Sequence, residues 1–249
     1  MAEITGKMML IDSSVCMGCR SCQVACKQWH HLPGEPVENL QFGHYENPKD
    51  LSGITFTRVR YIEHSNVLFR DSGRAASKYM QWLFFKDQCR HCVEPACKKG
   101  CPVSGAVVIK PSGAVVFTDA CDPDKCRKRP CEKECEYKNI PHLNVELNKE
   151  KKCDLCFDRF DHADLRPEEQ IPICAKTCPS GALKFGDVAY IQNLGYQRLA
   201  ELRSQYRSVK IYPEDDMSKT HVVWMLIGEY GIYKESEEHR DSHHEEEDD

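Results

Sequence analysis

The feature that most constrains this chain is its cysteine content, 16 of 249 residues. Every cysteine falls into one of four compact groups of four, and none lies outside them. The groups are Cys16, Cys19, Cys22 and Cys26; Cys89, Cys92, Cys97 and Cys101; Cys121, Cys126, Cys131 and Cys135; and Cys153, Cys156, Cys174 and Cys178. This regular division indicates that the thiols act in sets, as metal ligands or as disulfides.

The spacing of the first group distinguishes metal ligands from disulfides. It reads C-x2-C-x2-C-x3-C and matches the loop that binds [4Fe–4S] clusters in bacterial ferredoxins. Disulfides are disfavoured, because such close neighbours compete for the same partners and because disulfides require an oxidising compartment. Structural zinc is an alternative, for which the fourth group alone has suitable cysteine pairs.

A short internal repeat accompanies the second and fourth groups. Cys101 begins the segment CPVSGA, and Cys178 begins the similar segment CPSGA. Proline after the cysteine favours an extended or turn conformation, and each segment leads into a predicted strand. The repeat therefore predicts duplicated ferredoxin-like modules.

Composition limits the remaining fold classes. Apolar residues make up 41% of the chain and the mean hydropathy is −0.59. This composition predicts a loop-rich α+β fold that metal clusters stabilise more than a large core does. The longest apolar run, Val222–Ile227, is far shorter than the roughly 18 residues of a membrane-spanning helix. The first residues have no basic segment followed by an apolar stretch, so we expect no signal peptide in this chain.

The charge of the chain is concentrated at its end. Residues 234–249 hold nine acidic and two basic side chains, whereas the whole chain has a net charge of −5. This segment is typical of a disordered acidic tail. The rest is only slightly basic, so no nucleic-acid partner is expected.

Periodicity predicts several elements and no catalytic machinery. The expected strands are Lys7–Asp12, Ile54–Ile62, Trp82–Phe85 and Val222–Ile227, with a hairpin over 106–117 and an amphipathic helix over Gly195–Tyr206 whose inner face holds Tyr196, Leu199, Leu202 and Tyr206. His91 is expected to form a hydrogen bond beside a cluster, and His30 and His31 to lie in a surface loop. No nucleotide-binding or nucleophile motif is present, so the chain is expected to carry electrons without catalytic residues of its own.

Four cysteine groups in this order resemble the four-cluster iron–sulfur subunits that partner molybdenum or tungsten bis-pterin enzymes of the dimethyl sulfoxide reductase family. The resemblance is strongest to the beta subunit of soluble formate dehydrogenases and covers roughly residues 7–188. It is carried by KMMLIDSSVCMGCRSCQVACKQWHHLP from Lys7, WLFFKDQCRHCVEPACK from Trp82, KCDLCFDR from Lys152 and CAKTCPSGALKFGD from Cys174. The third group departs from the family pattern, because its spacing is wider and Glu136 stands where a proline commonly follows the last cysteine.

The resemblance implies a nested assignment of ligands to four [4Fe–4S] clusters, which spacing alone does not distinguish from sequential pairing. The implied sets are Cys16, Cys19, Cys22 and Cys178 for cluster 1; Cys26, Cys153, Cys156 and Cys174 for cluster 2; Cys89, Cys92, Cys97 and Cys135 for cluster 3; and Cys101, Cys121, Cys126 and Cys131 for cluster 4. Basic side chains, Lys152 among them, lie close to these cysteines in sequence. Positive charge raises the reduction potential of an anionic cluster, so the reduction potentials are expected to differ from cluster to cluster.

The cysteine groups, the cysteine-free segments and the nested modules that the resemblance implies together predict a domain organisation. The expected parts are a first ferredoxin-like module from 1–26 and 136–190, an insertion with short strands over 27–88, a second module over 89–135, a helix and strand extension over 191–233, and the acidic tail over 234–249.

By the same resemblance, the chain is expected to transfer electrons in a formate dehydrogenase. Its partners would be a catalytic subunit with a molybdenum or tungsten bis-pterin and a cytochrome or another acceptor. The complex is expected in the periplasm, exported with a signal-bearing partner, with the cytoplasm as the alternative. The same role beside an arsenate, polysulfide or dimethyl sulfoxide reductase is a second hypothesis, and a zinc-scaffolded interaction protein is a third.

Overall fold

The computed structural model describes residues 4–37, 45–64, 81–126, 128–137, 140–160 and 162–234. The predicted acidic tail lies outside these residues, apart from Lys234. In chain order the elements are β1 (Lys7–Asp12), α1 (Ser21–Trp29), β2 (Thr57–His64), β3 (Gln81–Gln88), α2 (Ala96–Lys99), β4 (Val107–Ile109), β5 (Val115–Phe117), α3 (Pro123–Cys126), α4 (Pro130–Lys133), β6 (His142–Asn144), β7 (Lys149–Lys151), η1 (Phe157–Arg159), η2 (Pro167–Glu169), α5 (Ile173–Lys176), β8 (Leu183–Asp187), α6 (Val188–Gln205), β9 (Val209–Tyr212), β10 (Val222–Ile227) and η3 (Tyr230–Tyr233). Helices and strands are mixed, as predicted.

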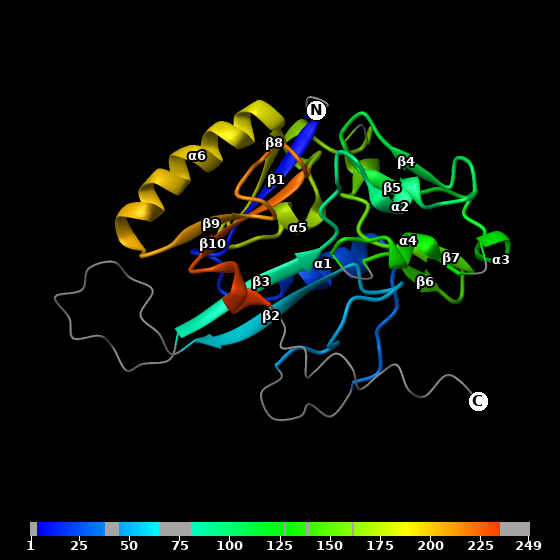
Figure 1. Ribbon diagram of the computed structural model, residues 1–249, viewed down its shortest axis with the longest axis horizontal. Helices are drawn as coiled ribbons and strands as arrows, with labels where there is room; N and C mark the ends of the chain where they lie inside the picture. Colours follow the sequence, from blue (N-terminus) through cyan, green and yellow to red (C-terminus); the bar gives the residue numbers. More distant parts are fainter. Residues whose placement is uncertain are drawn as a thin grey trace.

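A four-stranded sheet in the order β8-β1-β10-β9 brings the two ends of the described chain together. Strand β1 pairs parallel with β10 and antiparallel with β8, and β10 pairs antiparallel with β9. Figure 1 shows α6 along one side of this sheet and the β2–β3 hairpin on the other. The sheet is therefore covered on both faces.

Strand β10 owes its central place to its sequence, VVWMLI, in which every residue is buried. A continuous apolar run of this length is typical of a strand that is covered on both faces. The strand was predicted with its bounds, as was Lys7–Asp12, but the parallel pairing of the two was not. Pairing between residues more than 200 positions apart leaves no local signal in the sequence.

Helix α6 begins at Val188, two turns before the predicted start at Gly195. Glycine disfavours a helix interior, but here it lies in the middle of the helix. In the structure, an added Cβ at Gly195 would lie 2.8 Å from the side chain of Met217, so this position needs a residue without a side chain. The predicted inner face is wrong at Tyr196, which is 51% exposed, whereas Leu199 and Leu202 are buried as expected.

The insertion contains an antiparallel hairpin of β2 and β3, in which Arg60 pairs with Phe85. The predicted first strand began at Ile54, but the structure places a turn there. The Ser52 hydroxyl accepts hydrogen bonds from the backbone N–H groups of Ile54 at 3.2 Å and Thr55 at 3.0 Å. Such side-chain contacts compete with strand pairing and delay the start of β2.

Two small hairpins, β4–β5 and β6–β7, lie with the short helices α2, α3 and α4 on the right of Figure 1. The β4–β5 hairpin confirms the one predicted over residues 106–117. The segment between β3 and α2 is joined to the start of β10. The backbone N–H groups of His221 and Val222 donate hydrogen bonds to the carbonyls of His91 and Arg90, each at 3.0 Å.

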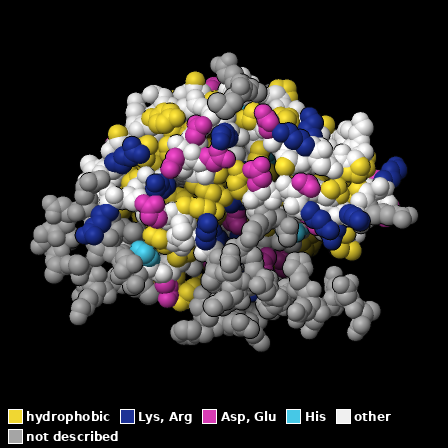
Figure 2. All heavy atoms as spheres, viewed as in Figure 1, with side chains coloured by type: hydrophobic (Ala, Val, Ile, Leu, Met, Phe, Trp, Pro, Cys, Tyr) yellow, Lys and Arg dark blue, Asp and Glu magenta, His cyan; other side chains and the backbone are white. Residues whose placement is uncertain are grey.

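The apolar core is larger than the composition predicts. Buried residues of the sheet, α6 and the β2–β3 hairpin form one continuous cluster, in which Met8, Met9 and Trp224 have no exposed surface. The sheet therefore does not depend on metal alone. Among the described helices, none has the length and apolar character to cross a bilayer. On the face drawn in Figure 2, the described acidic and basic side chains are interspersed.

Candidate metal centres

All 16 cysteines lie among the described residues, and each is a free thiol. This finding does not support the disulfide alternative. The loops that carry the thiols converge, so that cysteines from different sequence groups lie near one another. We name four quartets by the predicted ligand sets and describe them in turn.

The first quartet is Cys16, Cys19, Cys22 and Cys178. Burial, followed by the neighbouring thiols of Cys178 and Cys19, raises the pKa of Cys16. Cys178 belongs to the fourth sequence group, so the fold brings together cysteines that are more than 150 positions apart in the sequence. Cys19 is exposed, which places this quartet at the surface of the described molecule.

The second quartet is Cys26, Cys153, Cys156 and Cys174. All four line one narrow cavity, together with Lys86 from β3. Burial and then the thiols of Cys153 and Cys174 raise the pKa of Cys26 well above its usual range. The fourth sequence group is thus divided between two quartets, which counts against reading that group as one zinc site.

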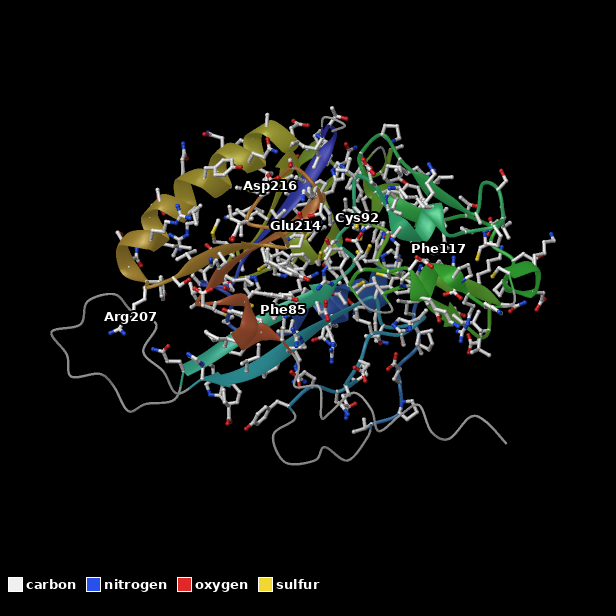
Figure 3. The ribbon with its side chains drawn as sticks, in the orientation of Figure 1. Phe85, Cys92, Phe117, Arg207, Glu214 and Asp216 are labelled. Carbon is white, nitrogen blue, oxygen red and sulfur yellow. The ribbon has the colours of Figure 1, made fainter. Side chains whose placement is uncertain are left out.

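The third quartet is Cys89, Cys92, Cys97 and Cys135. These residues line a cavity of about 330 Å³. Figure 3 shows Cys92 between the four-stranded sheet and the small hairpins, with Glu214 beside it. A cavity of this size holds far more than one ion or water molecule, whereas a structural zinc site closes tightly around the ion. The thiol donors and the space together fit a metal cluster.

The fourth quartet is Cys101, Cys121, Cys126 and Cys131. Burial and then the charges of Glu150 and Glu132, with Cys101 next, raise the pKa of Cys131. The carboxyl of Glu150 is buried beside these thiols, and its backbone N–H donates to Cys121 Sγ at 3.4 Å. The wide spacing of the third sequence group therefore still brings its first three thiols near Cys101.

Three of the loops share one backbone feature. In the first C-x2-C pair of each loop, the residue before the second cysteine has a positive φ: +66° at Gly18, +50° at His91 and +63° at Leu155. Left-handed residues turn successive amide groups toward one centre, and such concavities bind anions, including iron–sulfur clusters. The non-glycine residues keep this conformation at a cost, which is typical of functional loops.

The quartets follow one another in space. Cys22 of the first interacts electrostatically with Cys174 of the second, Cys153 of the second with Cys89 of the third, and Cys131 of the fourth with Cys97 of the third. Consecutive quartets are therefore neighbours, which gives a linear series from the first to the fourth.

His91 forms hydrogen bonds beside the third quartet. Its Nδ1 accepts a hydrogen bond from the backbone N–H of Val115 at 3.0 Å, and its own backbone N–H donates to Cys89 Sγ at 3.4 Å. Complete burial lowers the pKa of His91 well below its usual range and keeps the imidazole neutral. The prediction of a hydrogen-bonding role is in line with these contacts.

Comparisons with known proteins agree with this chemistry. Residues 80–188 match the family model of the 4Fe-4S dicluster domain. The formate dehydrogenase subunit beta of Megalodesulfovibrio gigas is 36% identical over 232 residues, which are 92% of this chain and 97% of the relative. The formate dehydrogenase 2 subunit beta (cytochrome c-553) of Nitratidesulfovibrio vulgaris is 35% identical over 233 residues, with 92% and 97% covered. This chain belongs to the family of formate dehydrogenase iron–sulfur subunits.

Some members of this family are longer. The formate dehydrogenase iron-sulfur subunit of Haemophilus influenzae is 36% identical over 219 residues, and the match spans 87% of this chain but 63% of that relative. The shared region contains the dicluster domain, so family membership and the thiol quartets support iron–sulfur clusters and an electron-transfer role for this chain.

Sequence reasoning missed two residues that contact the centres of this iron–sulfur subunit. His30 was expected in a surface loop, but its Nε2 lies 3.6 Å from Cys156 Sγ and 3.4 Å from Asp154 Oδ1. Lys86 received no role, although it lies inside the second cavity. Its position within the apolar run WLFF-K, at a buried place in β3, was the available signal.

Proposed function

We propose that this chain is the electron-transfer subunit of a formate dehydrogenase. Four [4Fe–4S] clusters, when bound, would supply one-electron carriers between a molybdenum or tungsten bis-pterin catalytic subunit and a cytochrome or another acceptor. The observation that carries the proposal is the linear series of four thiol quartets in a chain of this family.

The 16 cysteines would hold the clusters as the resemblance implies, one quartet to each. Neighbouring residues orient the thiols and donate backbone N–H groups to their sulfur atoms, as His91 of a cluster loop does to Cys89 and Glu150 of β7 does to Cys121. Because most of these thiols are buried or half-buried, the surrounding protein also limits the access of water. The exposure of Cys19 makes the first quartet a suitable place for electron exchange with a partner.

The domain organisation stays a proposal of two ferredoxin-like modules. Residues 1–26 with 136–190 would hold the first and second quartets, and residues 89–135 would hold the third and fourth. The grouping of the thiols supports this division. Residues 27–88 and 191–233 would then supply the hairpin and the sheet extension that support the modules.

Replacing Cys126 by serine tests the cluster of the fourth quartet. We expect the variant to lose or alter one cluster and to keep the other three, because Cys126 lies beside Cys101 and Cys121 and far from the first two quartets in the series. Four clusters require about 16 iron atoms per chain, and loss of one leaves about 12. Iron analysis of the purified complex measures this difference, and an unchanged iron content and spectrum would count against the assignment.

The identity of the partner tests the formate hypothesis. We expect a large subunit with a bis-pterin site to co-purify with this chain, and its sequence to be that of a formate dehydrogenase. A large subunit of the arsenate, polysulfide or dimethyl sulfoxide reductase type would keep the electron-transfer role and replace the substrate. A colourless complex with zinc and no iron would favour the scaffold hypothesis.

The resemblance also supports a periplasmic location, reached by export with a signal-bearing catalytic subunit. Cell fractionation with antibodies against both subunits tests this proposal. Recovery of both subunits in the cytoplasmic fraction would contradict it.

A further inference from the structure

Two lysines are buried among the thiol quartets. Lys86 is 2% exposed and Lys152 is 5% exposed. Lysine is almost never fully buried, because moving the ammonium group out of water has a large free-energy cost unless a negative charge compensates it. The surroundings of both amines are therefore informative.

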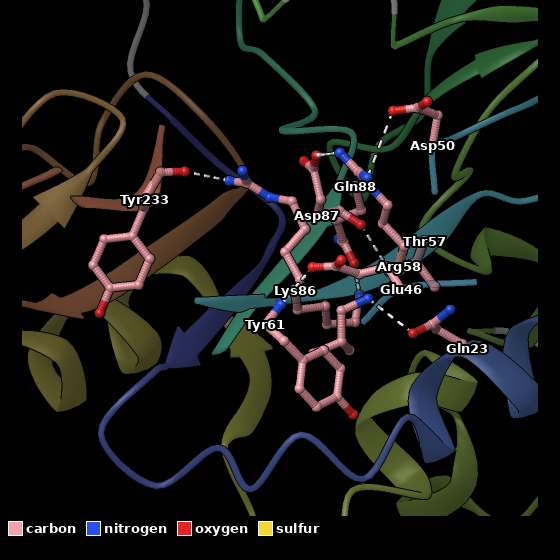
Figure 4. A network of polar contacts seen from close by, with 12 residues as sticks. Gln23, Glu46, Asp50, Thr57, Arg58, Tyr61, Lys86, Asp87, Gln88 and Tyr233 are labelled. Carbon is pink, nitrogen blue, oxygen red and sulfur yellow. Dashed lines mark hydrogen bonds and ion pairs between the residues drawn. The ribbon is translucent and has the colours of Figure 1, made fainter. Parts of the chain in front are cut away.

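Lys86 lies between the first and second quartets. Its side chain lines the cavity of the second quartet, and its Nζ donates a hydrogen bond to Gln88 Oε1 (Figure 4). The backbone carbonyl of Lys86 accepts a hydrogen bond from Trp224 Nε1 at 2.9 Å, which fixes this part of β3. Lys86 also interacts electrostatically with Cys174 of the second quartet and with Cys22 of the first.

Lys152 lies between the second and third quartets. It precedes Cys153 in sequence and lines the cavity of the third quartet. Its Nζ donates hydrogen bonds to the backbone carbonyls of Val115 at 2.6 Å and Cys153 at 2.9 Å. Lys152 also interacts electrostatically with Cys89 and Cys97 of the third quartet and with Cys153 of the second.

Neither amine forms an ion pair with a carboxylate in the part of the chain that the structure describes. Other buried cations do: Arg90 pairs with Asp87 at 2.7 Å. Clusters bound to the quartets, with their thiolate ligands, would supply the negative charge that compensates each lysine. By contrast, the ionisable group buried at the fourth quartet is a carboxyl, that of Glu150.

We propose that Lys86 and Lys152 hold fixed positive charge between successive clusters and raise the reduction potentials of the first three, above all the second. Reduction adds a negative charge to a cluster, and a buried cation nearby stabilises the reduced form more than the oxidised form. The second quartet lies between the two lysines, so both charges would raise the reduction potential of its cluster. This inference rests on the proposed function, because it requires clusters on the quartets.

Replacement by methionine tests the role of the charge, because methionine is similar in length and uncharged. Lys86→Met is expected to lower the potentials of the first and second clusters, and Lys152→Met those of the second and third. We expect the one-electron reduction equilibrium to fall at least tenfold, which corresponds to about 59 mV. Redox titration of the intact complex, followed by electron paramagnetic resonance, measures each potential without reference to activity.

Matched variants separate the charge from the shape of the side chain. Lys86→Arg keeps the charge and should keep the potentials near those of the wild type. Lys176→Met is the surface control, because Lys176 lies two residues from Cys174 but is 40% exposed and pairs with Glu169. Water screens such a charge, so its loss should leave all potentials unchanged.

The outcomes distinguish this inference from the function on which it rests. Iron content and signals as in the wild type, with unchanged potentials in both methionine variants, would overturn the role of the lysines and leave the proposed function intact. Absence of any cluster signal in the wild-type complex would overturn the proposed function instead. If Lys86→Met does not assemble its clusters, the potential of the second cluster in Lys152→Met decides the question.

Discussion

Trp224→Ala is expected to destabilise the protein by about 4 kcal/mol. Trp224 is completely buried in β10 and stacks on Phe85 of the β2–β3 hairpin at a ring distance of 5.4 Å. Its ring also meets Tyr212 edge to face at 5.5 Å, and its Nε1 donates to the carbonyl of Lys86. Alanine would leave a cavity between the sheet and the hairpin and a buried carbonyl without its donor.

Thermal unfolding of the purified complex measures this loss as a decrease of roughly 8–16 °C in the Tm of this subunit. Trp224→Phe should cost less, because it keeps an aromatic ring against Phe85 and loses only the hydrogen bond and part of the volume. Tyr196→Ala is the exposed control, with an expected change within about 0.5 kcal/mol. If Trp224→Ala unfolds at the wild-type temperature, the hairpin does not depend on this contact.

Asp87→Asn is expected to destabilise the protein by about 3–5 kcal/mol, because it removes the counter-charge of buried arginines. Asp87 Oδ1 accepts a hydrogen bond from Arg90 Nη1 at 2.7 Å, and its other oxygen lies 3.8 Å from Arg58 Nη2 (Figure 4 shows Arg58 and Asp87). Arg58 and Arg90 are both buried. Asparagine has nearly the same shape, so the effect comes from the charge.

The pH dependence gives this prediction a second readout. Burial alone would raise the pKa of Asp87, but Arg90 and Arg58 outweigh it and hold the pKa below its usual range. A lowered carboxyl pKa stabilises the folded state above the pKa of the unfolded chain, near pH 4, and this contribution is lost as the pH falls through the folded pKa. The Tm difference between wild type and Asp87→Asn should therefore shrink in acid.

An exposed ion pair supplies the control for Asp87. Asp187 accepts a hydrogen bond from Lys7 at 2.8 Å, but its side chain is 74% exposed. Exposed pairs contribute about 0–1 kcal/mol, so Asp187→Asn should change the Tm little. Equal effects of the two substitutions would show that the buried network around Asp87 contributes no more than a surface pair.

Local features of the sequence predicted the elements best. The alternating or continuous apolar segments at β1, β4–β5 and β10 gave their strands, because side-chain periodicity and turn residues act over a few positions. The start of α6 was missed, since the close approach of Met217 to Gly195 comes from a distant segment. The size of the core was underestimated, because composition does not show that both ends of the described chain join one sheet.

The metal centres were predictable in part for the same reason. Cysteine spacing indicated clusters, because three of the four ligands lie in one short loop in the first, third and fourth predicted sets. The fourth ligand comes from afar, and the pairing of Cys178 with the first loop followed from the family resemblance and not from spacing. Lys86 and His30 lie near their thiols only through folding; the apolar run before Lys86 was a weak local signal, and no local motif marks His30.

The optical response of the native complex to formate tests the central claim most directly. The complex would be purified without oxygen, and its visible absorption followed on addition of formate and then of dithionite. Bleaching by formate is the predicted result, because electrons from the partner's substrate would reach the clusters of this chain. Bleaching by dithionite alone would contradict formate as the substrate, and no bleaching by either would contradict the iron–sulfur account itself.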